Sequence, residues 1–334
     1  MVYSFYFATV NYRSINNRSM VSNRSEIKKK RVMILGPTAS GKTELAHRLA
    51  LEYDSDIISV DSRQCYKRID IGTAKPGPDL LNERRYFNIS ILELTESDSV
   101  ADFRKRAGAW AKQIRASGRP VIYAGGSTLH LQSIIEPLDP TPRSNPENIR
   151  YLEQKASNDG LESLYNELTR VDPVYADAMD GLNRQRILRA LDVWMQTGKP
   201  FSSFHTKNTP QPDDDLLVFG LDWPRKILHE RINNRVDRMI RKGLIEETRQ
   251  ILDDGFSAGL QSLQTVGYRD VISYFNGNVN RTQMIADIKT QTRRYAKRQI
   301  TWFRKWPFIH WMDAHEMTLT KMLEQIQKIQ HQPR

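Results

Sequence analysis

The sequence is poor in the features that mark secreted and membrane proteins. It has a single cysteine, Cys65, in 334 residues, which excludes a disulfide framework and any zinc site built from paired cysteines. No apolar run reaches the ~18 residues that a membrane-spanning helix needs. We therefore expect a protein of a reducing compartment, the cytoplasm, without a membrane segment.

Acidic residues are missing from one long stretch. None occurs from 289 to 305, and residues 225–305 hold 17 Lys/Arg against 8 Asp/Glu. The whole chain has a net charge of +11, so this region carries most of the excess. A basic region of this size indicates a polyanionic partner.

The first chemical motif is a phosphate-binding loop. Its residues are Gly36, Pro37, Thr38, Ala39, Ser40, Gly41, Lys42 and Thr43, which fit the pattern G-x-x-x-x-G-K-[ST]. A predicted buried strand, Val32 to Leu35, precedes the loop, and apolar residues at helical spacing follow it. This order aims backbone N–H groups and a helix N-terminus at an anion. We expect Lys42 to contact the terminal phosphate and Thr43 to offer a hydroxyl to Mg²⁺.

Two polar segments follow predicted strands and are expected at the same edge of a sheet. The strand Ile57 to Val60 ends at Asp61, and the strand Val121 to Ala124 ends at Gly125-Gly126-Ser127-Thr128. Ligands bind at this edge in open α/β sheets. From its position alone, Asp61 suits a Mg²⁺ ligand, a base or a turn cap. The glycine segment suits either a phosphate-binding loop or a plain turn with a serine helix cap.

Composition divides the chain into segments. Residues 1–30 are rich in Ser, Asn and Arg and are expected to form a disordered tail. Four prolines between Pro137 and Pro146 mark a junction, and residues 147–180 predict two short helices. We expect a P-loop NTPase-like α/β core, a parallel sheet flanked by helices, with an inserted all-helical lobe. The predicted ranges are 31–136 and 183–315 for the core, 137–182 for the lobe, and 316–334 for a C-terminal helix or tail.

After a predicted strand at Leu216 to Leu221 and predicted helices at 225–242 and 244–252, a long basic helix is predicted from about 282 to 305. At 100° per residue, an apolar face gathers Met284, Ile285, Ile288, Tyr295, Trp302, Phe303 and Trp306. The other side carries two basic stripes, Arg293, Lys297 and Arg304 beside Arg294, Arg298 and Lys305. A face of one sign repels itself unless an anion covers it, so we expect it to contact nucleic acid or polyphosphate.

Several motifs together resemble the tRNA dimethylallyltransferase (tRNA isopentenyltransferase) family in its bacterial form. They are GPTASGKT at 36–43, DSRQCY at 61–66, DIGTAKP at 70–76, Gly125–Leu129, QRILRAL at 185–191, Gly267-Tyr268 and TRRYAKRQITWFR at 292–304. The resemblance implies transfer of a dimethylallyl group from dimethylallyl diphosphate to the exocyclic amino group of the adenine 3′ of a tRNA anticodon. Diphosphate leaves, and the helical lobe grips the anticodon stem.

The resemblance also implies roles for residues. Asp61 is the general base, and Ser127, Lys42 and Arg231 complete the catalytic set. The phosphate loop holds the donor diphosphate, with Mg²⁺ on Thr43. The implied tRNA contacts are Asp61, Ser62, Arg63, Gln64, Ser127, Arg150, Gln185, Arg186, Ile187, Leu188, Arg189, Gln264, Gly267, Tyr268, Arg269, Arg293, Arg294, Lys297 and Arg298. The expected partners are the tRNA anticodon stem-loop and dimethylallyl diphosphate, and we expect a monomer.

The sequence departs from the family at two positions and leaves alternatives open. His130 stands where the family has an aromatic residue, and Cys65, which we expect to be buried, where an aliphatic one is usual. The main alternative is an ATP-dependent small-molecule kinase of the P-loop class, which would not need the basic helix. A non-catalytic RNA-binding protein is disfavoured by the intact Lys42, Thr43 and Asp61. A cytokinin synthase that prenylates adenylate would not need to grip tRNA.

Overall fold

The structure is a computed structural model that describes residues 30–205 and 210–330. The predicted tail lies, apart from Lys30, outside the described residues. The chain divides into two compact units. The larger unit combines Met1–Glu136 with Pro210–Arg334, and the smaller one is Pro137–Thr209.

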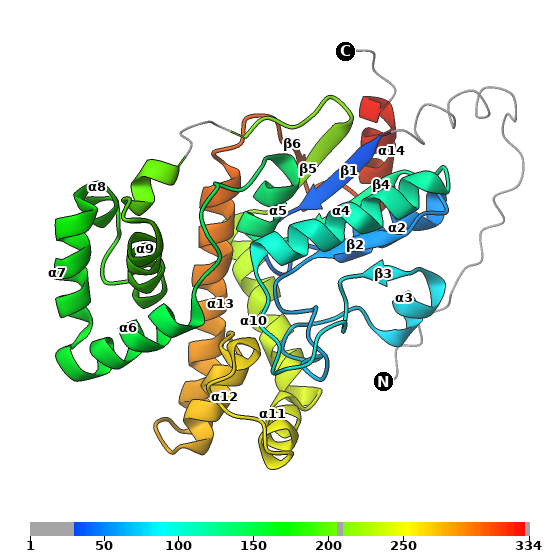
Figure 1. Ribbon diagram of the computed structural model, residues 1–334. Coiled ribbons are helices and arrows are strands. Elements are labelled where there is room, and N and C mark those ends of the chain that lie inside the picture. Colours follow the sequence, from blue (N-terminus) through cyan, green and yellow to red (C-terminus); the bar gives the residue numbers. More distant parts are fainter. Residues whose placement is uncertain (1–29, 206–209, 331–334) are drawn as a thin grey trace, which may run out of the picture. The chain divides into compact units, whose positions relative to one another are not determined.

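The larger unit is built on a parallel sheet. Within the described residues the sheet has six strands in the order β3-β2-β4-β1-β5-β6 (Figure 1). The strands are β1 (Arg31–Leu35), β2 (Ile57–Val60), β3 (Tyr86–Phe87), β4 (Val121–Gly125), β5 (Leu216–Asp222) and β6 (His310–Asp313). The predicted strands β1, β2, β4 and β5 are confirmed, as is the α/β fold. The sequence did not reveal β3 and β6, which are the edge strands.

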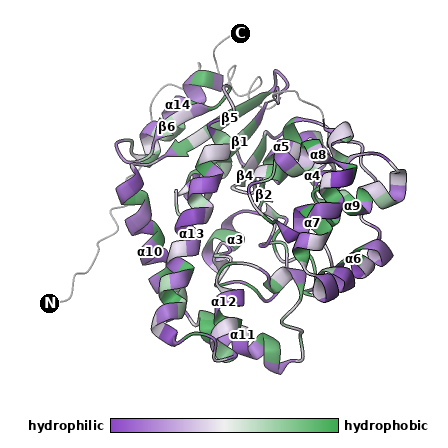
Figure 2. Ribbon diagram, turned by 90° about the vertical axis from the view of Figure 1, so that its left-hand side faces the viewer, coloured by the Kyte–Doolittle hydropathy of each residue, from purple (hydrophilic) through white to green (hydrophobic). Residues whose placement is uncertain are grey.

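Helices cover both faces of this sheet. In β1, Met33 and Leu35 contribute to one buried cluster and Val32 and Ile34 to another, because successive strand residues point to opposite faces. The first face packs against α4 (Val100–Ala116) and α5 (Thr128–Ile135), the second against α2 (Lys42–Glu52) and α14 (Leu319–Gln330). The central strands β1 and β5 are therefore mainly hydrophobic (Figure 2), apart from Arg31 at the start of β1 and Asp222 at the end of β5. The C-terminal segment predicted as a helix or tail forms the helix α14.

A helical layer in the same unit forms a third apolar cluster with the segment that follows β2. Its helices are α10 (Arg225–Arg241), α11 (Leu244–Asp253), α12 (Tyr268–Phe275) and α13 (Arg281–Phe303). The short element η2 (Gln261–Leu263) connects α11 to α12, whereas α3 (Pro78–Glu83) lies between β2 and β3. The cluster joins Val236 of α10, Leu244 of α11 and Met284 of α13 to Tyr66. The helices predicted at 225–242, 244–252 and 282–305 are confirmed, whereas α12 was not predicted.

The smaller unit is all-helical, with its own core. It contains α6 (Pro146–Asp159), α7 (Leu161–Val171), α8 (Pro173–Asp177), α9 (Arg184–Thr197) and η1 (Phe201–Phe204). The prediction that this lobe ends at 182 is wrong, because Ile187 and Leu191 of α9 are buried against Leu152 and Leu164 of α6 and α7. Three helices rather than two form over 147–180. In both units, no helix among residues 30–205 and 210–330 combines the length and apolarity needed to cross a bilayer.

Candidate active site

The phosphate-binding loop connects β1 to α2 at the carboxyl edge of the sheet. Gly41 has φ of 95° and Ala39 has φ of 64°, so the loop turns through the left-handed region at two positions. Two side chains hold its carbonyl groups from outside: Trp223 Nε1 donates to Ser40 O at 2.9 Å, and Arg231 Nε donates to Ala39 O at 2.9 Å. The Arg231 guanidinium also lies 4.0 Å from the Trp223 ring centroid. The strained loop is therefore fixed by α10 and the residue just after β5.

This placement bears on the catalytic role predicted for Arg231. The described residues that line the cavity beside the loop do not include Arg231 but do include Arg235, one turn further along α10. Arg235 was not singled out from the sequence, because four arginines recur along that helix at similar spacing. Its pKa is lowered, chiefly by burial, while the nearby Asp61 opposes the shift. Arg235 is the arginine of α10 placed to face an anion in the cavity.

Lys42 reaches the cavity from the first turn of α2. Its Nζ donates to Pro37 O at 3.1 Å. The pKa of Lys42 is lowered to about 8, first by burial and then by the charge of Arg235, with Asp61 acting in the opposite sense. The ammonium group therefore lacks a full counter-charge, and a bound anion would restore its pKa.

The cavity itself has a volume of about 330 Å³. Thr38, Lys42 and Thr43 of the loop line it together with Asp61. Asp61 is its only carboxylate among the described lining residues, and the basic members are Lys42, Arg63, Arg235, Arg269 and Arg298. One acid among five cations makes a site for a polyanion with a single candidate base.

Asp61 follows β2 and also shapes its own turn. Its Oδ1 accepts hydrogen bonds from the backbone N–H groups of Arg63 at 2.8 Å and Gln64 at 3.2 Å. The turn-cap interpretation is therefore correct for one oxygen. Those bonds leave Oδ2 of a cavity-lining carboxylate available to a ligand, so a second role as base or metal ligand is compatible with the geometry.

The glycine segment after β4 packs too closely for any side chain. A Cβ on Gly125 would overlap the Val60 carbonyl of β2, and one on Gly126 would overlap the Gln299 amide. Ser127 stands at the N-terminus of α5 but makes no capping hydrogen bond. Its Oγ instead accepts from Ser62 N–H at 3.1 Å. The helix-cap alternative is therefore wrong, and Ser127 joins the two strand ends beside Asp61.

Gln64 is already engaged within the protein. Its Nε2 donates to Thr73 O at 3.1 Å and Ala74 O at 3.2 Å, and its Oε1 accepts from Ser59 Oγ at 3.0 Å. Gln64 lines the cavity together with Thr73 and Ala74. The carboxamide thus fixes the DIGTAKP segment against the sheet edge.

Tyr268 is the clearest failure among the residues predicted to contact tRNA. It is fully buried, and its hydroxyl donates to Glu247 and accepts from Gly72 N–H at 3.0 Å. The reason is that Gly267, with φ of 102°, begins the unpredicted helix α12 and turns Tyr268 into the third cluster. Its neighbours Gln264, Gly267 and Arg269 do line the cavity.

The basic helix α13 is confirmed, with changes in which residues it buries. Tyr295, expected on the core side, is 37% exposed and lines the cavity with Arg298. Ala296 and Gln299 are buried in its place, because Ala296 packs in a small apolar cluster with residues of α10 and Gln299 is hydrogen-bonded to the loops after β1 and β4. Arg294, Lys297 and Arg298 are exposed, whereas Arg293 is half-buried and donates to Asn233 Oδ1 at 2.7 Å.

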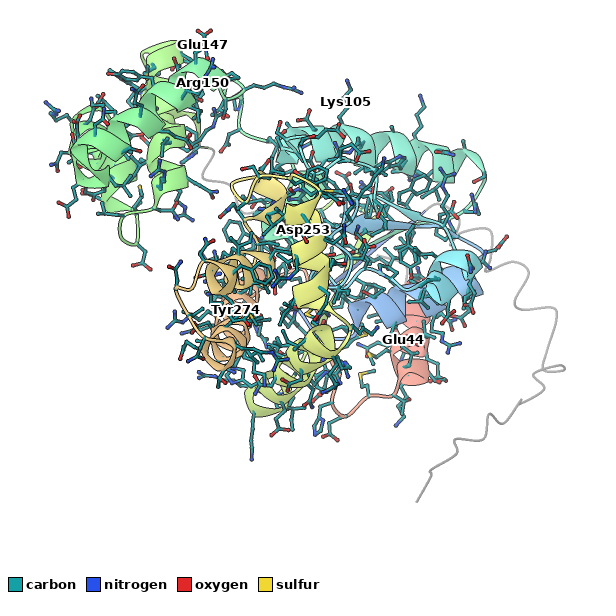
Figure 3. All side chains as sticks on the ribbon, turned by 90° about the horizontal axis from the view of Figure 1, so that it is seen from below. Glu44, Lys105, Glu147, Arg150, Asp253 and Tyr274 are labelled. Carbon is teal, nitrogen blue, oxygen red and sulfur yellow. The ribbon has the colours of Figure 1, made fainter. Side chains whose placement is uncertain are left out.

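The remaining predicted contacts lie on the smaller unit. Ile187 and Leu188 are buried in its core, so their side chains cannot contact tRNA. Arg189 is paired with Asp192 at 2.9 Å. The exposed candidates are Arg150 on α6, labelled in Figure 3, together with Gln185 and Arg186 on α9.

The two departures from the family pattern have structural explanations. His130 is buried, and its ring centroid lies 4.8 Å from that of Phe103. Burial is the main cause that lowers the pKa of His130, so the neutral ring substitutes for an aromatic residue in the core. Cys65 is fully buried as expected, and burial is the main cause that raises its pKa to about 12.

The cavity contains side-chain oxygen atoms that could bind a metal ion. The described residues contain no cluster of three or more His, Cys, Asp or Glu side chains that would hold a metal on their own. Thr43 and Asp61 are oxygen donors in the cavity lining. Mg²⁺ in phosphate sites typically takes one or two protein oxygens and completes its shell with phosphate and water, so these residues fit it.

The parallel sheet, the glycine loop and the cationic cavity define a P-loop-type protein with a site suited to a phosphorylated ligand. Comparison with known proteins gives the family. Residues 64–306 match the family model described as IPP transferase, and the chain belongs to this family.

Relatives in several bacteria support the assignment. The chain is 40% identical over 285 residues to the tRNA dimethylallyltransferase of Christiangramia forsetii, covering 85% of this chain and 93% of the relative. It is 40% identical over 299 residues to the tRNA dimethylallyltransferase of Carboxydothermus hydrogenoformans, covering 89% and 96%. Among solved structures, the tRNA isopentenylpyrophosphate transferase of Bacillus halodurans is similar with a TM-score of 0.66 and 34% identity, over 90% of this chain and 95% of that one.

Proposed function

We propose that this protein is a tRNA dimethylallyltransferase, which moves a dimethylallyl group from dimethylallyl diphosphate to the exocyclic amino group of the adenine 3′ of a tRNA anticodon. One observation carries the proposal: a single cavity is lined by Lys42 and Thr43 of the phosphate loop, by Asp61 and by four arginines. The names of the bacterial relatives support the same reaction.

Asp61 and the basic residues of the cavity have different roles in the proposed reaction. The adenine amine attacks C1 of the dimethylallyl group, the bond from C1 to the diphosphate oxygen breaks, and Asp61 takes the proton that the amine loses. Negative charge grows on the departing diphosphate, where Lys42 and Arg235 stabilise it. Arg231 contributes by donating a hydrogen bond to Ala39 O of the phosphate loop. Mg²⁺ would add positive charge at the diphosphate, with the Thr43 hydroxyl as its protein ligand.

The nucleic acid would contact the arginines that line the cavity. An adenine must leave its stack to reach Asp61 at the end of β2. Arg63, Arg269 and Arg298 line the cavity and are suited to the flanking phosphates. The exposed side chains of Arg294 and Lys297 continue this basic surface along α13. We further propose that the enzyme acts as a monomer in the cytoplasm, which gel filtration and cell fractionation would test.

The test is direct. The protein is incubated with labelled dimethylallyl diphosphate, Mg²⁺ and unmodified tRNA, and the label is traced to a nucleoside after digestion. We expect label on the adenine 3′ of the anticodon, and no dependence on ATP. Label that stays in the donor, together with turnover of ATP without tRNA, would instead assign the chain to the kinase alternative.

A further inference from the structure

Gln299 is an unusual residue in its helix. It lies on α13 next to the exposed Arg298, yet it is 3% exposed. Its Oε1 accepts from Thr38 N–H at 3.0 Å, and its Nε2 donates to Gly126 O at 2.8 Å. One carboxamide thus bridges the phosphate loop after β1 and the glycine segment after β4.

The Gln299 carboxamide lies so close to Gly126 that a side chain at residue 126 would overlap it. A Cβ on Gly126 would overlap Gln299 Nε2 and would lie 3.2 Å from Gly36 O and 3.5 Å from Lys42 Cε. Gly126, which Gln299 holds, therefore lies close to both Gly36 and Lys42 of the phosphate loop. Thr38 itself lines the cavity, so the amide that Gln299 engages belongs to the surface where a diphosphate would bind.

Other residues in the same part of α13 face the cavity and the phosphate loop. Tyr295 stands one turn before Gln299 on the same face, and both residues line the cavity. Ala296 and Ile300 pack in the small cluster that includes Ala39 of the phosphate loop. The opposite side of this turn carries the exposed Arg294 and Lys297, whereas Arg298 lines the cavity. A single helical segment therefore faces the expected polyanion on one side and the phosphate loop on the other.

We propose that Gln299 is a positioning residue that couples tRNA bound on α13 to the diphosphate site, so that each ligand increases the affinity for the other. The inference rests on the proposed function, because it takes tRNA as the occupant of the basic face. A tRNA bound on the outer face holds α13 in place. Through its two hydrogen bonds, the Gln299 carboxamide then also holds Thr38 and Gly126 in place. A donor that binds loops already held in place loses less conformational entropy. Coupling must be reciprocal, since it is a free energy shared by the two ligands.

The experiment measures this coupling without chemistry. Inorganic diphosphate with Mg²⁺ is titrated into the protein by calorimetry, with and without saturating unmodified tRNA. We expect tRNA to tighten diphosphate binding by about fivefold or more, the lower end of typical couplings. In Gln299→Met, which keeps the size of the side chain but not its hydrogen bonds, the ratio should fall below about twofold. The affinity for tRNA alone should stay unchanged.

Two further variants serve as controls for the role of Gln299. Gln299→Glu keeps an acceptor for Thr38 N–H and replaces the donor to Gly126 O by a charge. It should also lose the coupling, and it keeps the test open if Gln299→Met does not fold. Gln291→Met is the matched control, because it removes another carboxamide of α13, one that donates to Asp270 Oδ1 at 2.7 Å. It should keep the wild-type ratio.

The outcomes separate this inference from the proposed function. Under steady-state transfer with saturating tRNA, Gln299→Met should raise the KM for dimethylallyl diphosphate by the factor lost in the titration, with kcat nearly unchanged. A wild-type ratio of one, or a Gln299→Met variant that keeps the wild-type ratio, would overturn the positioning role while leaving the transferase assignment intact. Failure of the wild type to label tRNA would overturn the transferase assignment whatever the ratio.

Discussion

Removing the Tyr268 hydroxyl should destabilise the larger unit without weakening the contacts to tRNA phosphates. Tyr268→Phe deletes the donor to Glu247 and the acceptor for Gly72 N–H. Glu247 keeps two other donors, the N–H groups of Asp70 at 3.1 Å and Ile71 at 3.1 Å, so the carboxylate does not become an isolated buried charge. Gly72 N–H is the group left without its partner.

The structure sets the size of the effect. An amide left unpaired in a half-buried site costs about 1–3 kcal/mol, and a hydrogen bond to a charged group contributes about 1.5–3 kcal/mol. Because Glu247 retains partners, we take about 2–3 kcal/mol for the sum. For a unit of this size that loss lowers the melting temperature by about 4–12 °C. The segment that carries Gly72 also lines the cavity, so the KM for the donor should rise with it.

The assay combines calorimetric melting with tRNA binding at several salt concentrations. Tyr274→Phe is the control, because it removes a hydroxyl from the same helix, near its C-terminal end (Figure 3), and it should melt close to the wild type. A Tyr268→Phe protein that melts like the wild type but binds tRNA more weakly, with a flatter salt dependence, would mean that the hydroxyl faces a phosphate. The buried position of Tyr268 would then be wrong.

Three further changes test the site. Asp61→Asn keeps the acceptor that shapes the turn but not the base, so single-turnover transfer should slow by about 10²–10⁴ while tRNA binding is retained; a loss under tenfold would remove Asp61 from that role. Replacing Arg294 and Lys297 with Gln should weaken tRNA binding and flatten the log–log salt slope by about 0.7–0.9 per lost contact. Arg294 and Lys297 are replaced rather than Arg298, because Arg298 lines the cavity. Equal slopes in mutant and wild type would mean that the basic face of α13 is an ordinary solvated surface. Because the free Lys42 has a pKa of about 8 that a bound diphosphate raises, diphosphate affinity should weaken above pH 8 by up to about tenfold per pH unit. Lys42→Arg should not show that break, and an identical break in this variant would assign it to another group.

The sequence predicted the central strands and the long helices well, for a physical reason. Buried parallel strands such as β1 are continuous apolar runs, and a helix such as α13 repeats its apolar residues over several turns. The edge strands β3 and β6 are short and only partly buried, so they leave no comparable pattern. The lobe boundary failed because α9 has an apolar face like any other helix, and its sequence does not say which core that face joins.

The candidate site was predicted in its motifs but not in its side-chain partners. Lys42 and Asp61 line one cavity, as the strand order implies, and Ser127 is tied to its edge by the hydrogen bond from Ser62 N–H. Gln299 was not assigned and Tyr295 was wrongly assigned to the apolar face, because the helical pattern does not show whether a glutamine or tyrosine faces the core or the cavity. Arg231 and Arg235 show the same difficulty, since they differ by one helical turn but one holds the loop and the other faces the cavity.

The pairing of β1 has a consequence for how the protein is made. On one side β1 pairs with β4, but on the other its Arg31 lies opposite Leu216 of β5, which leaves the ribosome only after the whole segment 137–209 has been synthesised. The centre of the sheet therefore stays open along one edge while the helical lobe is translated. An unpaired apolar strand edge is prone to misassociation. The lobe, whose core is formed by nearby residues, can fold during that interval, so the order of segments along the chain gives a local domain time to form before the long-range pairing closes the sheet.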